Sequence, residues 1–126
     1  MMNKIAQNLH LYISIPIVTS VGLVYGFQSN ILFEIQPNSI DEHNVYKAIM
    51  GLYLAFAMLW SVALVQKQYW KTATISNIIF MLGLAIGRLV GFAIDGIPSK
   101  VLFLGFFGEI TLALYGVYQL KKANYF

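Results

Sequence analysis

Apolar residues fill four blocks of this chain, and each block is about as long as one membrane crossing. The pattern predicts helices over about residues 9–27, 40–65, 72–94 and 99–120. A helix needs about 20 mostly apolar residues to cross a hydrocarbon core of about 30 Å, and each block supplies them. We therefore expect an all-α fold, an integral membrane four-helix bundle, in which residues 1–126 form a single transmembrane domain.

The segments between the blocks carry signals that begin or end helices. Residues 28–39 form the longest connector, and the apolar run at 31–33 is too short to cross, so we expect this connector to lie at the membrane interface. Ser39 and Glu42 have the spacing of a capping box, which predicts that the second helix begins directly after Ser39. The Asp-Gly-Ile-Pro sequence at 95–98 predicts the end of the third helix, because glycine favours a left-handed cap and proline cannot continue a helix.

The composition supports a membrane protein and excludes several kinds of site. The chain is 59% hydrophobic and 10% charged, whereas soluble domains carry about 25% charged residues. It has no cysteine, so disulfides and thiolate metal sites are excluded. His10 and His43 lie on different segments, so we expect no metal site and no cofactor. The net charge of +3 includes no basic run longer than Lys121-Lys122, which argues against nucleic acid as a partner.

Lysines are distributed unevenly between the two predicted sides of the membrane. One side carries Lys4, Lys67, Lys71, Lys121 and Lys122, and the other carries Glu34, Asp41, Glu42, Asp95 and one lysine, Lys100. Cytoplasmic loops of membrane proteins carry an excess of lysine and arginine. We therefore expect both termini to lie in the cytoplasm.

Two charged residues interrupt the third and fourth apolar blocks. Arg88 is the only charge between Thr72 and Ile94, and Glu109 is the only charge between Val101 and Leu120. A charge in the middle of a membrane costs about 2.5–3.5 kcal/mol on insertion scales, so such a residue usually has a partner or a function. With a rise of 1.5 Å per residue, both charges lie about 10–12 Å below the outer ends of their helices. We therefore expect Arg88 and Glu109 to meet in the outer leaflet.

Three further residues are candidates for the same site. Lys47 lies about 10 Å below the start of the second helix, so we expect it at the depth of Arg88 and Glu109. Asp95 lies on the same helical face as Arg88, two turns further along the third helix. Tyr53 lies six residues after Lys47 on the second helix. The predicted ligand-binding set is therefore Lys47, Arg88, Glu109, Asp95 and Tyr53, with the cations meeting an anionic group.

The sequence leaves the function of these charges open. They can line a pocket that binds or transports a small anionic or lipid-like ligand. Alternatively, Glu109 can act as acid or base in an intramembrane isomerase or cyclase, or the Arg88–Glu109 pair can only fix helix register in a structural or assembly subunit. The glycines at positions 83, 87 and 91 form a close-packing ladder and suggest a homodimer face.

Several motifs point to a known family. They are Tyr46-Lys-Ala-Ile-Met-Gly-Leu-Tyr, Phe80-Met-Leu-Gly-Leu-Ala-Ile-Gly-Arg, Asp95-Gly-Ile-Pro-Ser, and Glu109 followed by Leu112-Ala-Leu-Tyr-Gly. Together they resemble the small four-helix bacterial membrane proteins called domain of unknown function 4345, over about residues 25–122.

The chain departs from the pattern of that family at two positions. Lys47 stands where the family is expected to have arginine, and Leu82 where glycine is common, so the charge at 47 is kept without the two-pronged geometry of arginine. The resemblance implies a multi-pass protein of the bacterial inner membrane. It supports the choice of Lys47, Arg88, Asp95 and Glu109, but it carries no activity.

Overall fold

Four long helices make up most of the protein. The computed structural model describes residues 4–125, in the order α1 (Lys4–Phe27), α2 (Ser29–Leu32), α3 (Ile40–Val65), η1 (Lys67–Tyr69), α4 (Trp70–Asp95) and α5 (Lys100–Lys122). No strand occurs among these residues. α1, α3, α5 and the η1–α4 segment are each long and apolar enough to cross a membrane. The all-α prediction is therefore confirmed, together with four helices of the expected kind.

The helix ends agree with the predicted ones to within a few residues. α3 has the predicted bounds, whereas α1 begins at Lys4, because its polar first turns continue the helix ahead of the apolar block. Ser39 Oγ accepts a hydrogen bond of 3.1 Å from the Glu42 N–H, as the capping box predicts. The Glu42 carboxylate reaches one residue further back than expected and accepts from the Asn38 N–H at 3.0 Å. After α4, Gly96 has a φ of 99°, a conformation that glycine adopts without strain.

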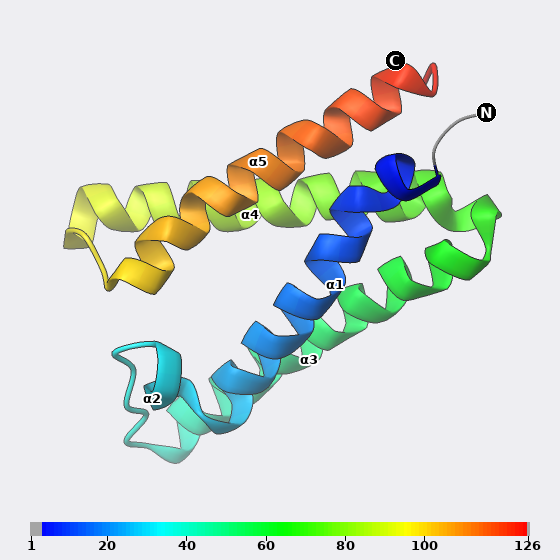
Figure 1. Cartoon of the computed structure of the whole chain (residues 1–126). Helices are drawn as coiled ribbons and strands as arrows, with labels where there is room; N and C mark the ends of the chain where they lie inside the picture. The colour runs from blue at the N-terminus through cyan, green and yellow to red at the C-terminus, as the bar shows by residue number, and fades with distance from the viewer. Residues whose placement is uncertain (1–3, 126) are drawn as a thin grey trace.

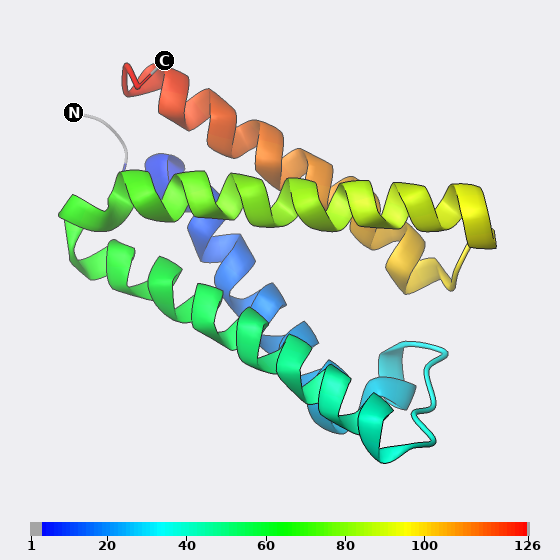
Figure 2. The same cartoon turned by 180° about the vertical axis from the view of Figure 1, so that it is seen from behind.

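The long helices form two antiparallel pairs. α1 packs along α3, and α4 packs along α5 (Figures 1 and 2). Gly22 and Gly26 bring α1 close to α3, since a Cβ atom at Gly22 would lie only 2.8 Å from Tyr53 Cβ, and one at Gly26 would overlap Met50. These two glycines therefore allow the close packing of α1 on α3.

The two pairs meet at one end and diverge toward the other. The start of α1 and the end of α5 lie at the end where the pairs meet, and the views from front and back show the α2 connector and the α4–α5 loop at the opposite end (Figures 1 and 2). We call the first of these the lysine end, because it carries Lys4, Lys67, Lys71, Lys121 and Lys122. Buried apolar side chains such as Leu11, Trp60 and Ala73 fill the junction of the pairs near this end.

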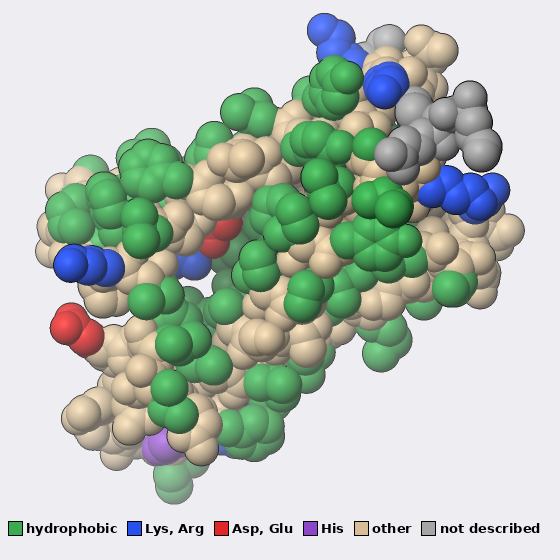
Figure 3. Space-filling view, in the orientation of Figure 1, with side chains coloured by type: hydrophobic (Ala, Val, Ile, Leu, Met, Phe, Trp, Pro, Cys, Tyr) green, Lys and Arg blue, Asp and Glu red, His purple; other side chains and the backbone are tan. Residues whose placement is uncertain are grey.

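Large apolar side chains cover the outside of the helices. Met58, Ile79 and Leu114 are each more than 60% exposed, and apolar side chains are spread over the visible face (Figure 3). A surface this apolar is typical of helices that are surrounded by lipid.

Candidate functional site

Arg88 and Glu109 form a closed ion pair between α4 and α5. Arg88 Nε donates to Glu109 Oε1 at 2.8 Å and to Oε2 at 3.1 Å, and Arg88 Nη2 donates to Oε2 at 2.9 Å. The two side chains are 17% and 11% exposed, so little solvent separates or screens them. The expectation that Arg88 and Glu109 meet is therefore confirmed, whereas their place in the outer leaflet stays a prediction.

The hairpin of α4 and α5 explains why the pair forms. The loop between the two helices is short, so residues at similar distances from it lie opposite each other. Gly105, one turn before Glu109, lies next to the guanidinium, since a Cβ atom built there would be in ordinary contact with Arg88 Nη2 at 4.0 Å. The hydrogen bonds to Glu109 come from Nε and Nη2, so the two N–H groups of Nη1 donate none to the carboxylate.

The ion pair lies at the wall of a cavity between the two helix pairs. This inter-pair cavity has a volume of about 220 Å³. Residues from the two pairs and from the connector line it: Ile17, Val18, Val21, Phe33, Tyr53, Met81, Leu84, Arg88, Val101, Leu102, Gly105, Gly108, Glu109 and Leu112. Figure 3 shows the hollow between the pairs, with acidic and basic side chains inside it. Apart from the pair and the Tyr53 hydroxyl, the lining side chains are apolar.

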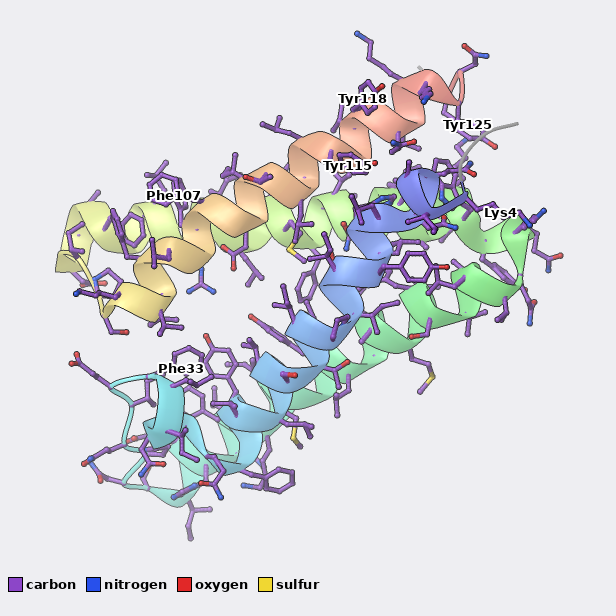
Figure 4. All side chains as sticks on the ribbon, in the orientation of Figure 1. Lys4, Phe33, Phe107, Tyr115, Tyr118 and Tyr125 are labelled. Atoms are coloured by element: carbon purple, nitrogen blue, oxygen red, sulfur yellow. The ribbon has the colours of Figure 1, made fainter. Side chains whose placement is uncertain are left out.

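Two aromatic rings, those of Phe33 and Tyr53, line the cavity, and the Tyr25 ring packs against both of them. The Tyr25 ring stacks on Phe33 at a centroid distance of 4.9 Å and meets Tyr53 edge-on at 5.6 Å. The Tyr25 hydroxyl lies within electrostatic range of Arg88 and Glu109. Phe33, part of the connector that we expected at the membrane interface, is buried within the protein, on the α2 side of the gap (Figure 4). Sequence reasoning missed Tyr25 and Phe33, because neither shares a helix with the charges.

A second, wider hollow lies on the other side of Tyr25 and Tyr53, which both line it. It has a volume of about 590 Å³, is lined mainly by α3 and α4, and shares Tyr53 and Leu84 with the inter-pair cavity. Tyr53, one of the predicted site residues, therefore separates two hollows.

The structure does not bring the other two predicted residues into the cavity. Lys47 is exposed, and its Nζ donates to the Gly26 carbonyl oxygen at 3.0 Å and lies 5.4 Å from the centre of the Phe27 ring. Asp95 is exposed at the last residue of α4, two helical turns beyond Arg88. The expected convergence of Lys47 with Arg88 and Glu109 was therefore wrong, because Lys47 turns toward the end of α1.

A second polar group lies where the two helix pairs join, and sequence reasoning missed it. His10 Nε2 and Thr74 Oγ1 are 3.0 Å apart, linking α1 to α4, and both residues are fully buried. One turn further along the same helices, Ser14 and Asn77 are also buried, and their side-chain polar atoms have no hydrogen-bond partner among residues 4–125. The signal was present in α1, since its buried residues His10, Ser14, Val18, Gly22 and Gly26 recur every four positions.

Two further expectations concern metals and dimers. Within the described range, no three His, Asp or Glu side chains come close enough to hold a metal ion. The glycine ladder at 83, 87 and 91 meets nothing, since no atom of the described chain lies within 4 Å of a Cβ atom built at any of the three. The face is therefore not used inside the chain, and the homodimer stays a prediction.

Comparison with known proteins places the chain in a family. The chain has no match among the curated proteins or the solved structures. Residues 6–120 match the family described as Domain of unknown function (DUF4345), which is the family that the motifs around Lys47, Arg88, Asp95 and Glu109 resemble. With nearly its whole length matched, the chain belongs to this family, whose function is unknown.

Proposed function

We propose that this protein binds a lipid-like ligand in the inter-pair cavity, with the apolar part of the ligand between the helix pairs and its polar group at Arg88. One observation carries the proposal: a cavity whose walls are apolar apart from the ion pair and the Tyr53 hydroxyl contains a guanidinium whose Nη1 is not used by its counter-ion. Ligand sites are typically apolar hollows with a few polar groups that fix orientation.

The geometry favours a neutral hydrogen-bond acceptor over an anion at Arg88. Glu109 already balances the charge of Arg88, and Lys47 points elsewhere, so the cavity has no excess positive charge from the residues that line it. An ester, carbonyl or hydroxyl oxygen can accept from Nη1 without disturbing the pair. Acid–base catalysis is less well supported, because Arg88 holds both oxygens of Glu109.

The size of the cavity fits a slender apolar group. An apolar cavity of about 150 Å³ holds one benzene molecule, and the inter-pair cavity is about 220 Å³. A segment of one acyl or isoprenoid chain therefore fits, whereas a whole phospholipid does not. The divergence of the helix pairs offers such a chain a route from the bilayer.

The proposal includes an orientation in the bacterial inner membrane. With the lysine end in the cytoplasm, as the excess of lysines there favours, Arg88 lies in the outer leaflet. Its position seven residues before the end of α4 places it about 10 Å below the outer helix ends. The ligand would therefore enter from the outer leaflet.

Photo-crosslinking tests the proposal. The purified protein in lipid nanodiscs is incubated with a diazirine-labelled long-chain alcohol, irradiated and digested, and the labelled residues are identified by mass spectrometry. We expect labels on cavity residues such as Leu102 and Leu112. A Gly108→Leu variant, which places a side chain in the cavity where a Cβ atom meets nothing within 4 Å, should lose these labels.

Gly51→Leu is the matched control. Gly51 is also helical and exposed, its Cβ position is equally open, and it lines neither hollow. This variant should keep the labels on Leu102 and Leu112. Labels spread evenly over the lipid-facing residues, or unchanged in Gly108→Leu, would contradict the proposal.

A further inference from the structure

A third hollow, separate from the two described above, lies at the lysine end, opposite the inter-pair cavity. It has a volume of about 270 Å³, and parts of all four long helices or their ends contribute to it. Lys4, Gln7 and Asn8 come from α1, Lys67 from η1, Trp70 from the start of α4, and Tyr125 from the segment after α5. Figure 4 shows Lys4 and Tyr125 near each other at this end.

The charges around this pocket have one sign. Two lysines line it, and none of the described residues that line it is Asp or Glu. Four of the five acidic residues of the chain lie near the opposite end, and the fifth, Glu109, is bound to Arg88. None of the described side chains that line the pocket therefore supplies a carboxylate that could balance Lys4 and Lys67.

An unpartnered donor lines the pocket beside the two lysines. Trp70 is only 8% exposed, and its Nε1–H is buried with no acceptor among residues 4–125. An indole N–H and a lysine ammonium can only donate hydrogen bonds, so the pocket offers three donor-only groups. The buried Asn8 Oδ1 is also unpartnered and can accept from a hydroxyl. A group that carries both acceptor oxygens with negative charge and a hydroxyl satisfies all four.

We propose that this lysine-end pocket binds the head group of an anionic phospholipid, with the phosphate at Lys4, Lys67 and the Trp70 N–H and a head-group hydroxyl at Asn8. Lysine with tryptophan and tyrosine at the ends of membrane helices is the composition of the lipid head-group region. The site is separate from the inter-pair cavity and does not depend on the function proposed there.

Lipid titration of the purified full-length protein in a non-ionic detergent tests the site. Phosphatidylglycerol, phosphatidylcholine and inorganic phosphate are added in separate arms, and binding is followed by the shift in thermal unfolding and by native mass spectrometry. We expect one tightly bound phosphatidylglycerol. Phosphatidylcholine, with the same phosphate but no net charge and no head-group hydroxyl, should bind more weakly.

Two pairs of lysine substitutions separate the pocket from the general charge of this end. Each lysine near an anionic head group contributes about fivefold to binding, so Lys4→Gln with Lys67→Gln should weaken binding about 30-fold. Lys121→Gln with Lys122→Gln removes the same charge from the same end but outside the pocket, and should change binding little. Trp70→Phe, which keeps the ring and removes the donor, should weaken binding about tenfold, as expected for a hydrogen bond to a charged group.

Three results would overturn the site. Equal weakening by the two lysine pairs would show diffuse attraction to the lysine end. Binding of phosphatidylcholine as tight as that of phosphatidylglycerol would show that the pocket recognises neither the net charge nor the hydroxyl of the head group. A shift with inorganic phosphate and none with phosphatidylglycerol would show a soluble anion in place of a lipid. Circular dichroism of each variant establishes that it is folded, and Trp70→Phe supplies an independent reading should the lysine variants unfold.

Discussion

Removing Glu109 alone should destabilise the protein strongly, whereas removing Glu109 and Arg88 together should not. In Glu109→Leu, the guanidinium of Arg88 stays in the cavity wall with no counter-ion. Two of its N–H groups lose acceptors at 2.8–3.1 Å. Hydrogen bonds to charged groups contribute about 1.5–3 kcal/mol each, so the expected loss is about 3–6 kcal/mol. Breaking a buried ion pair by removing one partner typically costs about 3–5 kcal/mol, in the same range.

The double variant Arg88→Met with Glu109→Leu replaces the pair with apolar side chains. Exchanges of this kind are often neutral or stabilising by about 1–4 kcal/mol. The two single losses should therefore not add, and the coupling energy of the double-mutant cycle should reach about 3 kcal/mol or more. Lys100→Met, which removes an exposed charge at the start of α5, is the control and should change stability by less than about 0.5 kcal/mol.

Reversible unfolding in mixed micelles measures these energies, with SDS as denaturant and helix content followed by circular dichroism. A loss below about 1 kcal/mol for Glu109→Leu would refute the idea of a closed, buried pair, since it falls under the value of one charged hydrogen bond. Additive losses in the double variant would refute it as well. If the double variant is stable, it also permits the crosslinking experiment without Arg88, and the labels at the cavity should then weaken.

Three further predictions concern the helix contacts and the orientation. Gly22→Leu should lower the free energy of unfolding by about 1–3 kcal/mol, the usual cost of overpacking, because its Cβ alone would lie 2.8 Å from a Cβ atom of α3; an unchanged SDS titration would contradict the close α1–α3 contact. His10→Phe and Thr74→Val should each lower the free energy of unfolding by about 1 kcal/mol, and the double variant should lower it by less than the sum of the two. Additive losses would argue against a hydrogen bond between these residues. The chain has no cysteine, so single cysteines can report the orientation. Lys67→Cys should react with a membrane-impermeant maleimide only from the cytoplasmic side and Glu34→Cys only from the other side. Labelling of both from the same side, or of each from the reverse side, would contradict the orientation.

The sequence was sufficient to predict the helices and the ion pair. Hydropathy gave the four helices because a membrane span requires a long apolar block. The contact between Arg88 and Glu109 could be predicted because a short loop joins their helices. Such a loop determines which residues of the two helices lie at the same level. Within one hairpin, counting residues from the loop is enough to decide which side chains lie at the same level.

Contacts between helices that are not joined by a short loop could not be predicted in this way. Lys47 lies near the end of α1, where the Gly26 carbonyl belongs to the last turn of the helix and needs a donor. That bond and the negative end of the α1 dipole explain why the lysine turns away from Arg88. Depth alone could not show this, because it does not say which neighbour a helix face meets. The His10–Thr74 contact could not be predicted for the same reason, because α1 and α4 are not joined by a short loop.

The most direct test of the proposed function is a structure of the protein in a lipidic mesophase, with density good enough to place side chains. The account predicts elongated non-protein density in the inter-pair cavity, along Leu102 and Leu112, with an oxygen within hydrogen-bond distance of Arg88 Nη1. It also predicts that this density is missing in Gly108→Leu. Helix pairs that close on each other and leave no such cavity in the wild type, with the Arg88–Glu109 pair intact, would contradict the proposal and leave the pair as a structural contact.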